Sequence, residues 1–329
     1  MTSAIPPGEF EIIARYFSRA SRRSDVLLGI GDDAALLQVP SDRRLVAAMD
    51  TLVEGVHFPV GTAARSIGHR ALAVNLSDLA AMGAEPAWAL LSLSLPESNA
   101  EWLAEFSKGL HDLAQRYNVA LVGGDTVRGP LVITVQVLGF IEAGPALTRG
   151  GARPGDLIYV SGIPGEAAAG LAVIQGQTVE GEDSELLRHR FNWPEPRVQL
   201  GQTLRTLASA AMDVSDGLLG DLGKLCQASA CSAQLELERL PASPSMRALF
   251  DAAASERFAL LGGDDYELLF TVAAGRVPEF EALVQNTEPG CTRIGRITQR
   301  DPGQAVVQCL RDGRAVVVPA TGYDHFSKA

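Results

Sequence analysis

The sequence lacks an excess of positive charge and any long apolar run. Its 329 residues carry a formal net charge of −11, so no basic face is available to displace the counterions of a nucleic acid. No stretch of about 18 or more apolar residues is present to form a membrane-spanning helix. The first residues show no charged segment followed by an apolar run, as a signal peptide would. We therefore predict a cytoplasmic protein that binds neither nucleic acid nor a membrane.

The few cysteines lack the spacing of a metal site. None of Cys226, Cys231, Cys291 and Cys309 belongs to a C-x-x-C pair. We interpret all four as small buried apolar residues in a reducing compartment, and a zinc site is not expected.

The common phosphate-binding loops are also missing. There is no G-x-x-x-x-G-K-[ST] loop and no kinase glycine-rich loop with its catalytic residues. Gly29-Ile30-Gly31 is followed by Asp32-Asp33 rather than by x-x-Gly, so it does not match the dinucleotide fingerprint. A nucleotide bound here needs its charge neutralised by metal ions, local arginines or backbone N–H groups.

What the chain does have is clustered aspartate. Nine of its 19 aspartates lie in five short groups, four of them on predicted glycine-flanked turns: Asp32-Asp33, Asp50 with Asp78, Asp125, Asp213 with Asp216, and Asp264-Asp265. Ionised carboxylates within about 4–6 Å raise one another's pKa unless cations lie between them. Carboxylate oxygens suit Mg²⁺, which usually bridges to substrate phosphates. Asp-Gly pairs also simply make turns, an equally good explanation of any one group, but five groups together favour a multi-metal phosphate site.

Asp213-Val-Ser215-Asp216-Gly217 is the most informative single segment. A predicted strand ends at Asp213, a turn exposes Ser215 and Asp216, and Gly217 begins a helix. The alternative, a capping residue that complements the helix dipole, explains one acid but not three, since Asp221 follows one turn later.

Two further positions keep two interpretations at this point, and a third is assigned no role. Gly123-Gly124-Asp125 follows an apolar strand, and its glycines either allow a phosphate to approach the backbone or form a turn. Arg149 either clamps a phosphate or is an ordinary solvated arginine. The residues alone assign His57 no role.

Apolar periodicity predicts strands and helices that alternate along the chain, an α/β (α+β) fold. Glycine and proline between Gly144 and Gly155 mark a boundary, giving an N-terminal domain over 1–145 and a C-terminal domain over 146–329. Residues 176–186 are predicted to be an exposed loop. The expected helices cover 8–20, 63–82, 99–117, 165–174, 197–208 and the segment after Gly217. The expected strands cover 45–49, 88–95, 119–122, 131–140, 157–160, the segment into Asp213 and 266–272. Three antiparallel closing strands are expected at 292–297, 305–310 and 315–318.

Together these segments resemble the thiamine-monophosphate kinase family over essentially the whole chain. That family belongs to the superfamily of aminoimidazole-ribonucleotide synthetase and selenophosphate synthetase. The runs Leu52–Phe58 and Asn75–Gly83 are the parts most specific to the kinase. The full match comprises Gly29–Ala34, Asp50–Phe58, Ala73–Gly83, Gly123–Thr126, Leu147–Arg149, Asp213–Leu218, Gly262–Leu268 and Gly322–Phe326.

The resemblance implies ATP-dependent phosphorylation of thiamine monophosphate to thiamine diphosphate, by direct transfer with several Mg²⁺ ions and without a phospho-enzyme. It implies a two-domain synthetase-like fold, with an N-terminal mixed sheet that forms a barrel in a homodimer and a C-terminal α/β sandwich. It also assigns residues: metal binding to Asp33, Asp50, Asp78, Asp125, Asp213 and Asp216, ATP binding to Gly124, Asp125, Arg149 and Ser215, and thiamine binding to His57, Asp264 and Tyr323.

Two positions depart from the family pattern. Ala48 and Met49 stand where Ser or Thr commonly precedes Asp50, so a hydroxyl ligand is lost and only the Met49 carbonyl is left to bind a metal ion. Asp264 replaces the usual Glu and reaches about one methylene less far. Two alternatives stay open: another ATP-dependent synthetase of the superfamily, or a nucleotide-binding regulator without catalysis.

Overall fold

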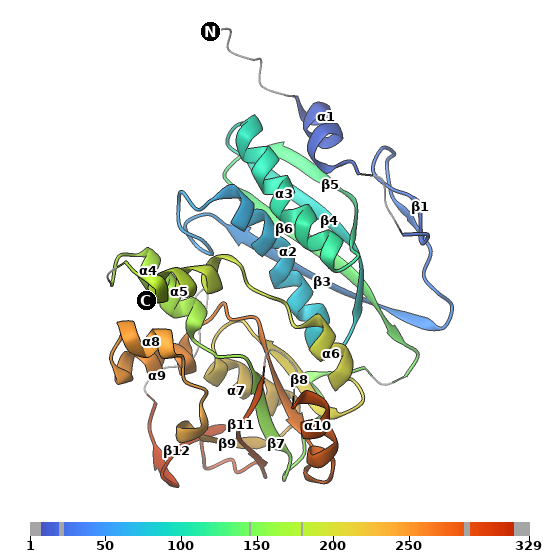
Figure 1. Cartoon of the computed structure of the whole chain (residues 1–329). Coiled ribbons are helices and arrows are strands. Elements are labelled where there is room, and N and C mark those ends of the chain that lie inside the picture. Colours follow the sequence, from blue (N-terminus) through green and yellow to red (C-terminus); the bar gives the residue numbers. More distant parts are fainter. Residues whose placement is uncertain (1–7, 20–22, 145, 179, 286–289, 319–329) are drawn as a thin grey trace. The chain divides into compact units, whose positions relative to one another are not determined.

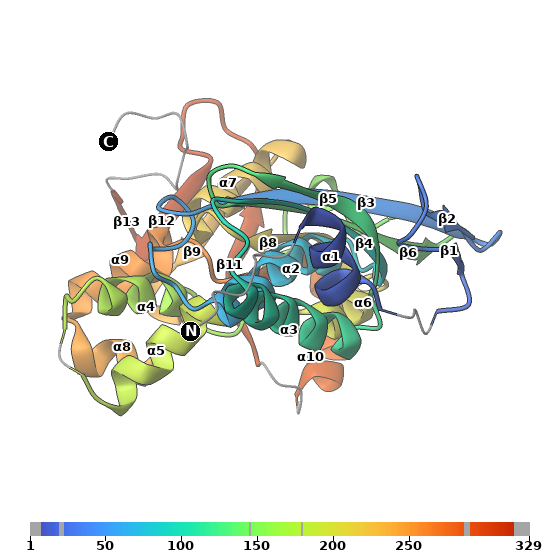
Figure 2. The same ribbon diagram turned by 90° about the horizontal axis from the view of Figure 1, so that it is seen from above.

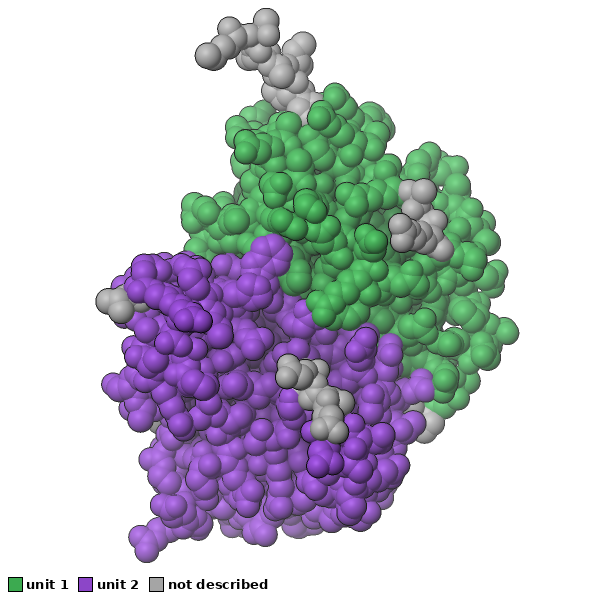
Figure 3. All heavy atoms as spheres, viewed as in Figure 1, with its two compact units in different colours: residues 1–79, 84–145 green, residues 80–83, 146–329 purple. Residues whose placement is uncertain are grey.

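The chain separates into two compact units, each described here by itself. The computed structural model describes residues 8–19, 23–144, 146–178, 180–285 and 290–318. Unit 1 comprises Met1–Leu79 and Ala84–Pro145, and unit 2 comprises Ala80–Gly83 and Ala146–Ala329 (Figure 3). Both units combine helices with sheets, so the prediction of an α/β (α+β) fold is confirmed. Within the described ranges, no helix has both the length and the apolar character needed to cross a membrane.

Unit 1 is built on a mixed sheet of four strands among its described residues, in the order β3-β6-β4-β5. β6 pairs antiparallel with both β3 and β4, and β4 pairs parallel with β5. A short antiparallel hairpin of β1 (Val26–Leu28) and β2 (Leu36–Leu37) packs Val26 and Leu37 against the buried cluster that contains Trp88 and Phe140 of the sheet. The four strands are β3 (Arg43–Val53), β4 (Glu85–Leu95), β5 (Ala120–Arg128) and β6 (Val132–Glu142).

Two helices, α2 (Ala64–Ala81) and α3 (Ala100–Arg116), lie side by side on one face of this sheet (Figures 1 and 2). Asn99 caps α3, where its side chain accepts the backbone N–H groups of Glu101 and Trp102. The helices touch through their backbones: a Cβ at Gly68 would lie 2.0 Å from the Phe106 carbonyl oxygen, and one at Gly109 would lie 1.9 Å from that of Arg65. Glycine at these two positions therefore sets the spacing of the pair.

The opposite face of the sheet carries exposed apolar side chains. The register places Thr51, Thr134, Ser92 and Asp125 in one row across the four strands. Since side chains alternate along a strand, the exposed side chains of Leu45, Met49 and Val127 share the face of this row.

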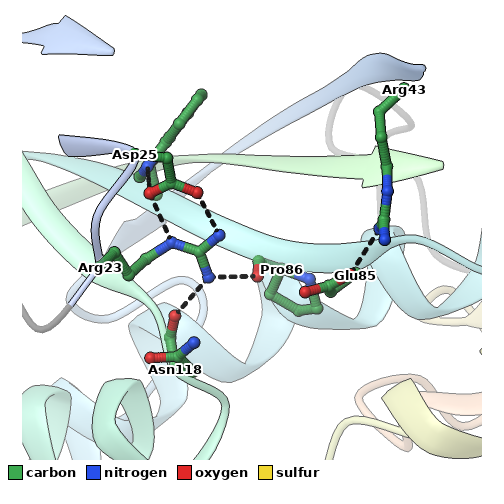
Figure 4. Close-up of polar contacts among 7 residues, drawn as sticks. Arg23, Asp25, Arg43, Glu85, Pro86 and Asn118 are labelled. Atoms are coloured by element: carbon green, nitrogen blue, oxygen red, sulfur yellow. Dashed lines mark hydrogen bonds and ion pairs between the residues drawn. The ribbon is translucent and has the colours of Figure 1, made fainter. Parts of the chain in front are cut away.

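Arg23 fastens the segment before β1 to the rest of unit 1. Its guanidinium donates two hydrogen bonds to Asp25, at 2.9 and 2.6 Å, and others to the carbonyls of Asn118 and Pro86 (Figure 4). Trp88 donates its indole N–H to the same carboxylate. Burial alone would raise the pKa of Asp25, but the bonds from Arg23 and Trp88 outweigh it and lower the pKa. Figure 4 also shows the more exposed pair of Arg43 and Glu85.

We expect His111 to make the stability of unit 1 depend on pH. It is buried on α3, and its Nε2 donates to the Tyr16 carbonyl at 3.1 Å in the short helical segment Ile13–Phe17. Burial, followed by the charge of Arg19, lowers its pKa to about 4. An unfolded histidine has a pKa of about 6.5 and takes up its proton first, so stability is complete above this value and falls by roughly 3 kcal/mol toward pH 4.

We expect His111→Gln to remove this part of the pH dependence. Urea unfolding of both proteins between pH 7 and pH 5 measures it as a difference in slope. His189→Gln, at an exposed position of α5 (Glu182–Asn192), is the control and should retain the wild-type slope. Equal slopes for His111→Gln and the wild type would contradict the prediction.

Unit 2 contains a sheet of seven strands over the part of the chain that is described, in the order β13-β12-β9-β11-β7-β10-β8. β12 pairs parallel with β9, and the other neighbours pair antiparallel. The strands are β7 (Leu157–Ser161), β8 (Ala208–Val214), β9 (Ser232–Glu236), β10 (Glu267–Val272), β11 (Cys291–Thr298), β12 (Val307–Arg311) and β13 (Arg314–Val316).

One helix of unit 2, α7 (Leu218–Ala228), carries the site described below. It packs Leu218, Leu222, Leu225 and Cys226 into the main core of the unit, against the strands. This anchors the turn between β8 and α7. The other α-helices of the unit are α4 (Glu166–Ile174), α5, α6 (Val198–Leu204), α8 (Pro244–Leu249), α9 (Ala252–Leu261) and α10 (Val277–Val284).

Three local predictions are wrong. Gly123, Gly124 and Asp125 lie inside β5 rather than on a turn, because β4 offers them a parallel ladder partner. The predicted loop over 176–186 already contains the start of α5 at Glu182. The closing strands are not all antiparallel, since β12 pairs parallel with β9. Of the cysteines, Cys226, Cys231 and Cys309 are buried as expected, whereas Cys291 is half-buried.

Candidate active site

A cavity of about 1110 Å³ lies on the open face of the unit 1 sheet. Asp33 and Asp125 line it together with Met49 and Gly124, and Asp32 adds a third carboxylate. The Asp33 loop and the middle of β5 are far apart in the sequence. The structure therefore brings together two of the predicted metal-binding acids and the residue that departs from the family pattern.

Gly124 has a local structural reason to be glycine. Its φ angle is +149°, and a Cβ there would lie 1.8 Å from the carbonyl oxygen of Leu91 on β4. The pairing of β4 with β5 also shifts register just before this position, between Ala89 and Leu90. The close approach at Gly124 is thus made by the neighbouring strand.

Asp50, Asp78 and His57 lie elsewhere in unit 1. Asp50 is paired with Val135, so its side chain shares the helix-covered face with that residue, and its backbone N–H donates to Asn75 of α2 at 2.9 Å. Asp78 is half-buried on α2. His57 Nδ1 accepts the backbone N–H of Val53 at 3.0 Å, so the neutral ring carries its proton on Nε2.

In unit 2, the turn after β8 is shaped by a buried carboxylate. Asp213 is the penultimate residue of β8 and is buried, while Ser215 and Asp216 are half-exposed. The Asp221 side chain, fully buried on the first turns of α7, accepts the backbone N–H groups of Ser215 and Asp216, both at 3.0 Å. Its other oxygen accepts Lys224 at 2.8 Å. Burial raises the pKa of Asp221, although the Lys224 ammonium acts in the opposite direction.

The Asp264 loop continues the sheet beside this turn. Asp264 N–H donates to the Ser215 carbonyl and Tyr266 N–H to the Val214 carbonyl, both at 2.9 Å. Asp264 and Tyr266 have positive φ angles, +69° and +52°, a strained conformation for residues other than glycine. Asp265 between them accepts backbone N–H groups at the start of α4, from Gly165 at 2.7 Å and from Ala167 at 3.2 Å. The loop is therefore held at both sides.

A buried ion pair follows the loop and was not predicted from the sequence. Arg197 donates through Nε and Nη2 to the two carboxylate oxygens of Glu267, the first residue of β10. The Ser161 hydroxyl donates to the same carboxylate at 2.5 Å. The Arg197 and Glu267 side chains are only 12% and 8% exposed. They are 70 residues apart in the sequence, so no local spacing could have revealed the pair.

Two residues predicted to belong to the site, Arg149 and Tyr323, contribute little to the description of its geometry. Arg149 is exposed at the start of a short 3₁₀ turn, Arg149–Gly151, and its carbonyl accepts the Ser229 hydroxyl at 2.7 Å. Tyr323 lies outside the described residues.

The candidate ligands suit a hard cation such as Mg²⁺ whose coordination is completed by oxygens from outside the protein. The candidate ligand side chains are carboxylates, which Mg²⁺ favours. Among the residues that the structure describes, no three His, Cys, Asp or Glu side chains are grouped closely enough to hold a metal ion. An ion at these acids must therefore complete its shell with other oxygens, as Mg²⁺ does with substrate phosphates.

Comparison with known proteins identifies the family. Residues 31–141 match the model of the AIR synthase related protein N-terminal domain, and residues 153–308 match that of its C-terminal domain. The chain is 46% identical to the thiamine-monophosphate kinase of Escherichia coli K12, over 97% of this chain and 98% of that protein. It is 36% identical to the thiamine-monophosphate kinase of Bacillus subtilis 168, over 97% and 99%.

Solved structures agree. The crystal structure of thiamine-monophosphate kinase from Stenotrophomonas maltophilia K279a matches with a TM-score of 0.83 at 46% identity, over 90% of this chain and 93% of that one. AaThiL complexed with AMPPCP and TMP matches with a TM-score of 0.75 at 31% identity, over 90% and 92%. Hydrogenase maturation protein HypE in complex with ATP, at 21% identity and a TM-score of 0.75 over 95% of each chain, shares the fold alone. The chain belongs to the thiamine-monophosphate kinase family, within the AIR synthase related proteins.

Proposed function

We propose that this protein transfers the γ-phosphoryl group of ATP to thiamine monophosphate and so makes thiamine diphosphate. The observation that carries the proposal is the similarity to kinases of this name over nearly the whole of both chains, 46% for the Escherichia coli enzyme. The related AaThiL was solved with AMPPCP and TMP bound. An acid is present at every matched acidic position of the family motifs, and at Asp264 it is Asp where the family usually has Glu.

Metal binding is assigned to carboxylates in each unit. The proposed ligands in unit 1 are Asp33, Asp50, Asp78 and Asp125 with the Met49 carbonyl, and those in unit 2 are Asp213 and Asp216. When bound, Mg²⁺ would neutralise the phosphates and so offset the repulsion between two anionic reactants.

The remaining residues bind and orient the two substrates. Gly124, Asp125, Arg149 and Ser215 are proposed to contact ATP, with Arg149 as the exposed guanidinium that can pair with a phosphate. His57, Asp264 and Tyr323 are proposed to contact the thiamine substrate. The backbone bonds from Asp264 and Tyr266 to the β8–α7 turn would keep the Asp264 carboxylate in place.

No strong general base is needed for this reaction. The second pKa of a phosphate monoester is near 6, so the acceptor is already ionised at neutral pH. Phosphoryl transfer then depends on positioning and on electrostatic stabilisation. This accounts for a site in which no side chain is assigned as a nucleophile or as a general base.

We also propose that the protein forms a homodimer through the open face of the unit 1 sheet. Leu45, Met49 and Val127 on this face are 47%, 61% and 49% exposed. Large apolar side chains that are exposed on the same sheet face, here on its two edge strands, favour burial against a second copy.

The decisive experiment incubates the protein with Mg²⁺, ATP and thiamine monophosphate. We expect equal amounts of ADP and thiamine diphosphate, measured by chromatography. ADP without thiamine diphosphate would show that the acceptor is wrong and would favour another synthetase of the superfamily. Nucleotide binding without ADP formation would favour a regulator. A reaction with unphosphorylated thiamine in place of the monophosphate is the control and should give no product.

A further inference from the structure

Lys224 is one of three lysines among the 28 basic residues of the chain, the others being Lys108 and Lys328. It projects from α7, and its ammonium contacts two carboxylates: Asp216 at 2.5 Å and Asp221 at 2.8 Å. One of these acids is a proposed metal ligand, and the other shapes the turn that carries it. Lys224 therefore occupies a position that neither the family motifs nor the proposed mechanism has used.

Asp216 and Asp221 differ in how firmly their side chains are held. The Asp221 side chain is fully buried, and all its oxygens are engaged, one by Lys224 and the other by the backbone N–H groups of Ser215 and Asp216. The side chains of Asp216 and Lys224 are 38% and 42% exposed. Asp216 can therefore exchange its partner, whereas Asp221 is fixed.

We propose that Lys224 is the counter-ion of Asp216 and Asp221 in the metal-free protein, and that it releases Asp216 to Mg²⁺ when the metal–nucleotide complex binds. This inference rests on the proposed function, since it takes Asp216 as a metal ligand. An ammonium and a metal ion compete for the same carboxylate oxygen. The flexible lysine stem lets Lys224 leave Asp216 while it keeps its contact with Asp221.

The competition between Lys224 and a metal ion for Asp216 should change the metal affinity by a measurable factor. The interaction of two unit charges a few ångströms apart in water corresponds to about a fivefold change in affinity. We therefore expect Lys224→Gln to bind Mn²⁺, the probe for this site, about fivefold more tightly than the wild type in the absence of nucleotide. Lys224→Arg keeps the charge and should retain the wild-type affinity.

The matched control is Lys108→Gln. Lys108 also pairs with an aspartate on its own helix, Asp112 at 3.1 Å, and is similarly exposed, but it belongs to α3 and to no candidate site. Electron paramagnetic resonance of free Mn²⁺ measures binding to the full chain. The control should match the wild type. In an Asp216→Asn background, Lys224→Gln should no longer change the affinity, because the contested carboxylate is gone.

A second measurement uses the wild type and does not depend on the folding of a variant. Protein labelled with ¹³C at the lysine ε-carbons gives three signals, which the Lys108→Gln and Lys224→Gln spectra assign. Adding Mg²⁺ with the non-hydrolysable analogue AMPPCP should shift the Lys224 signal and leave that of Lys108 in place. We expect this shift because Lys224 would lose its contact with Asp216.

Three outcomes would overturn the inference: unchanged or weaker Mn²⁺ binding by Lys224→Gln, the same gain in the Asp216→Asn background, or a Lys224 signal that stays fixed at saturating nucleotide. If the wild type still makes thiamine diphosphate in these cases, only the role of Lys224 is wrong. If the wild type makes none, the proposed function fails instead.

Discussion

Asp213→Asn and Asp216→Asn are each expected to lower thiamine diphosphate formation by about a thousandfold, the upper end of the loss seen when one preorganised electrostatic group is removed. Asparagine keeps the size of the side chain but removes the charge that would bind the metal ion. Asp213 sits at the end of a buried strand, and Asp216 lies on the turn that Asp221 holds by two backbone bonds. Because the core packing of α7 is unaffected, unit 2 should stay folded.

The measurement is kcat with Mg²⁺, ATP and thiamine monophosphate, with circular dichroism to check folding. Asp112→Asn is the matched control, since Asp112 pairs with exposed lysine and arginine side chains on α2 and α3, outside the candidate site. It should keep nearly full activity. Near-normal turnover in both Asp213→Asn and Asp216→Asn would refute their assignment as metal ligands.

The sequence was a good guide wherever apolar periodicity was strong. Helix α2 was expected over 63–82 and is found over Ala64–Ala81, and α3 was expected over 99–117 and is found over Ala100–Arg116. The glycine run at 123–125 was misjudged for a physical reason. Local turn preference favoured a break, but β4 supplies the ladder partner that keeps β5 extended to Arg128.

The site was predicted less completely than the fold. Clustered aspartates pointed to Asp33 and Asp125, which do line one cavity. Asp50 is separated from them because the strand register places it in the row of Val135, on the other face of the sheet. This register could not be predicted from the sequence of one strand alone. Lys224 could have been found, since it lies three residues after Asp221, a spacing that brings side chains together on a helix.

Breaking the ion pair of Arg197 and Glu267 is expected to have the largest effect on stability. Among the residues that the structure describes, Arg197→Met leaves the buried Glu267 carboxylate with the Ser161 hydroxyl as a side-chain donor. Removing one partner of a buried pair typically costs about 3–5 kcal/mol, because the remaining charge stays desolvated. Urea unfolding of the full chain, followed by a probe of unit 2 such as Trp193 fluorescence, measures the loss.

Two comparisons separate burial from charge as the cause. Arg311→Met breaks the exposed pair with Glu256 in the same unit, whose side chains are 51% and 39% exposed, and should lose no more than about 1 kcal/mol. The double variant Arg197→Met/Glu267→Leu removes both charges and should be more stable than Arg197→Met alone, because no unpaired charge remains buried. If Arg197→Met lost no more stability than Arg311→Met, the ion pair would not be what anchors the first residue of β10. The Asp264 loop would then depend on Asp265, which accepts two backbone hydrogen bonds.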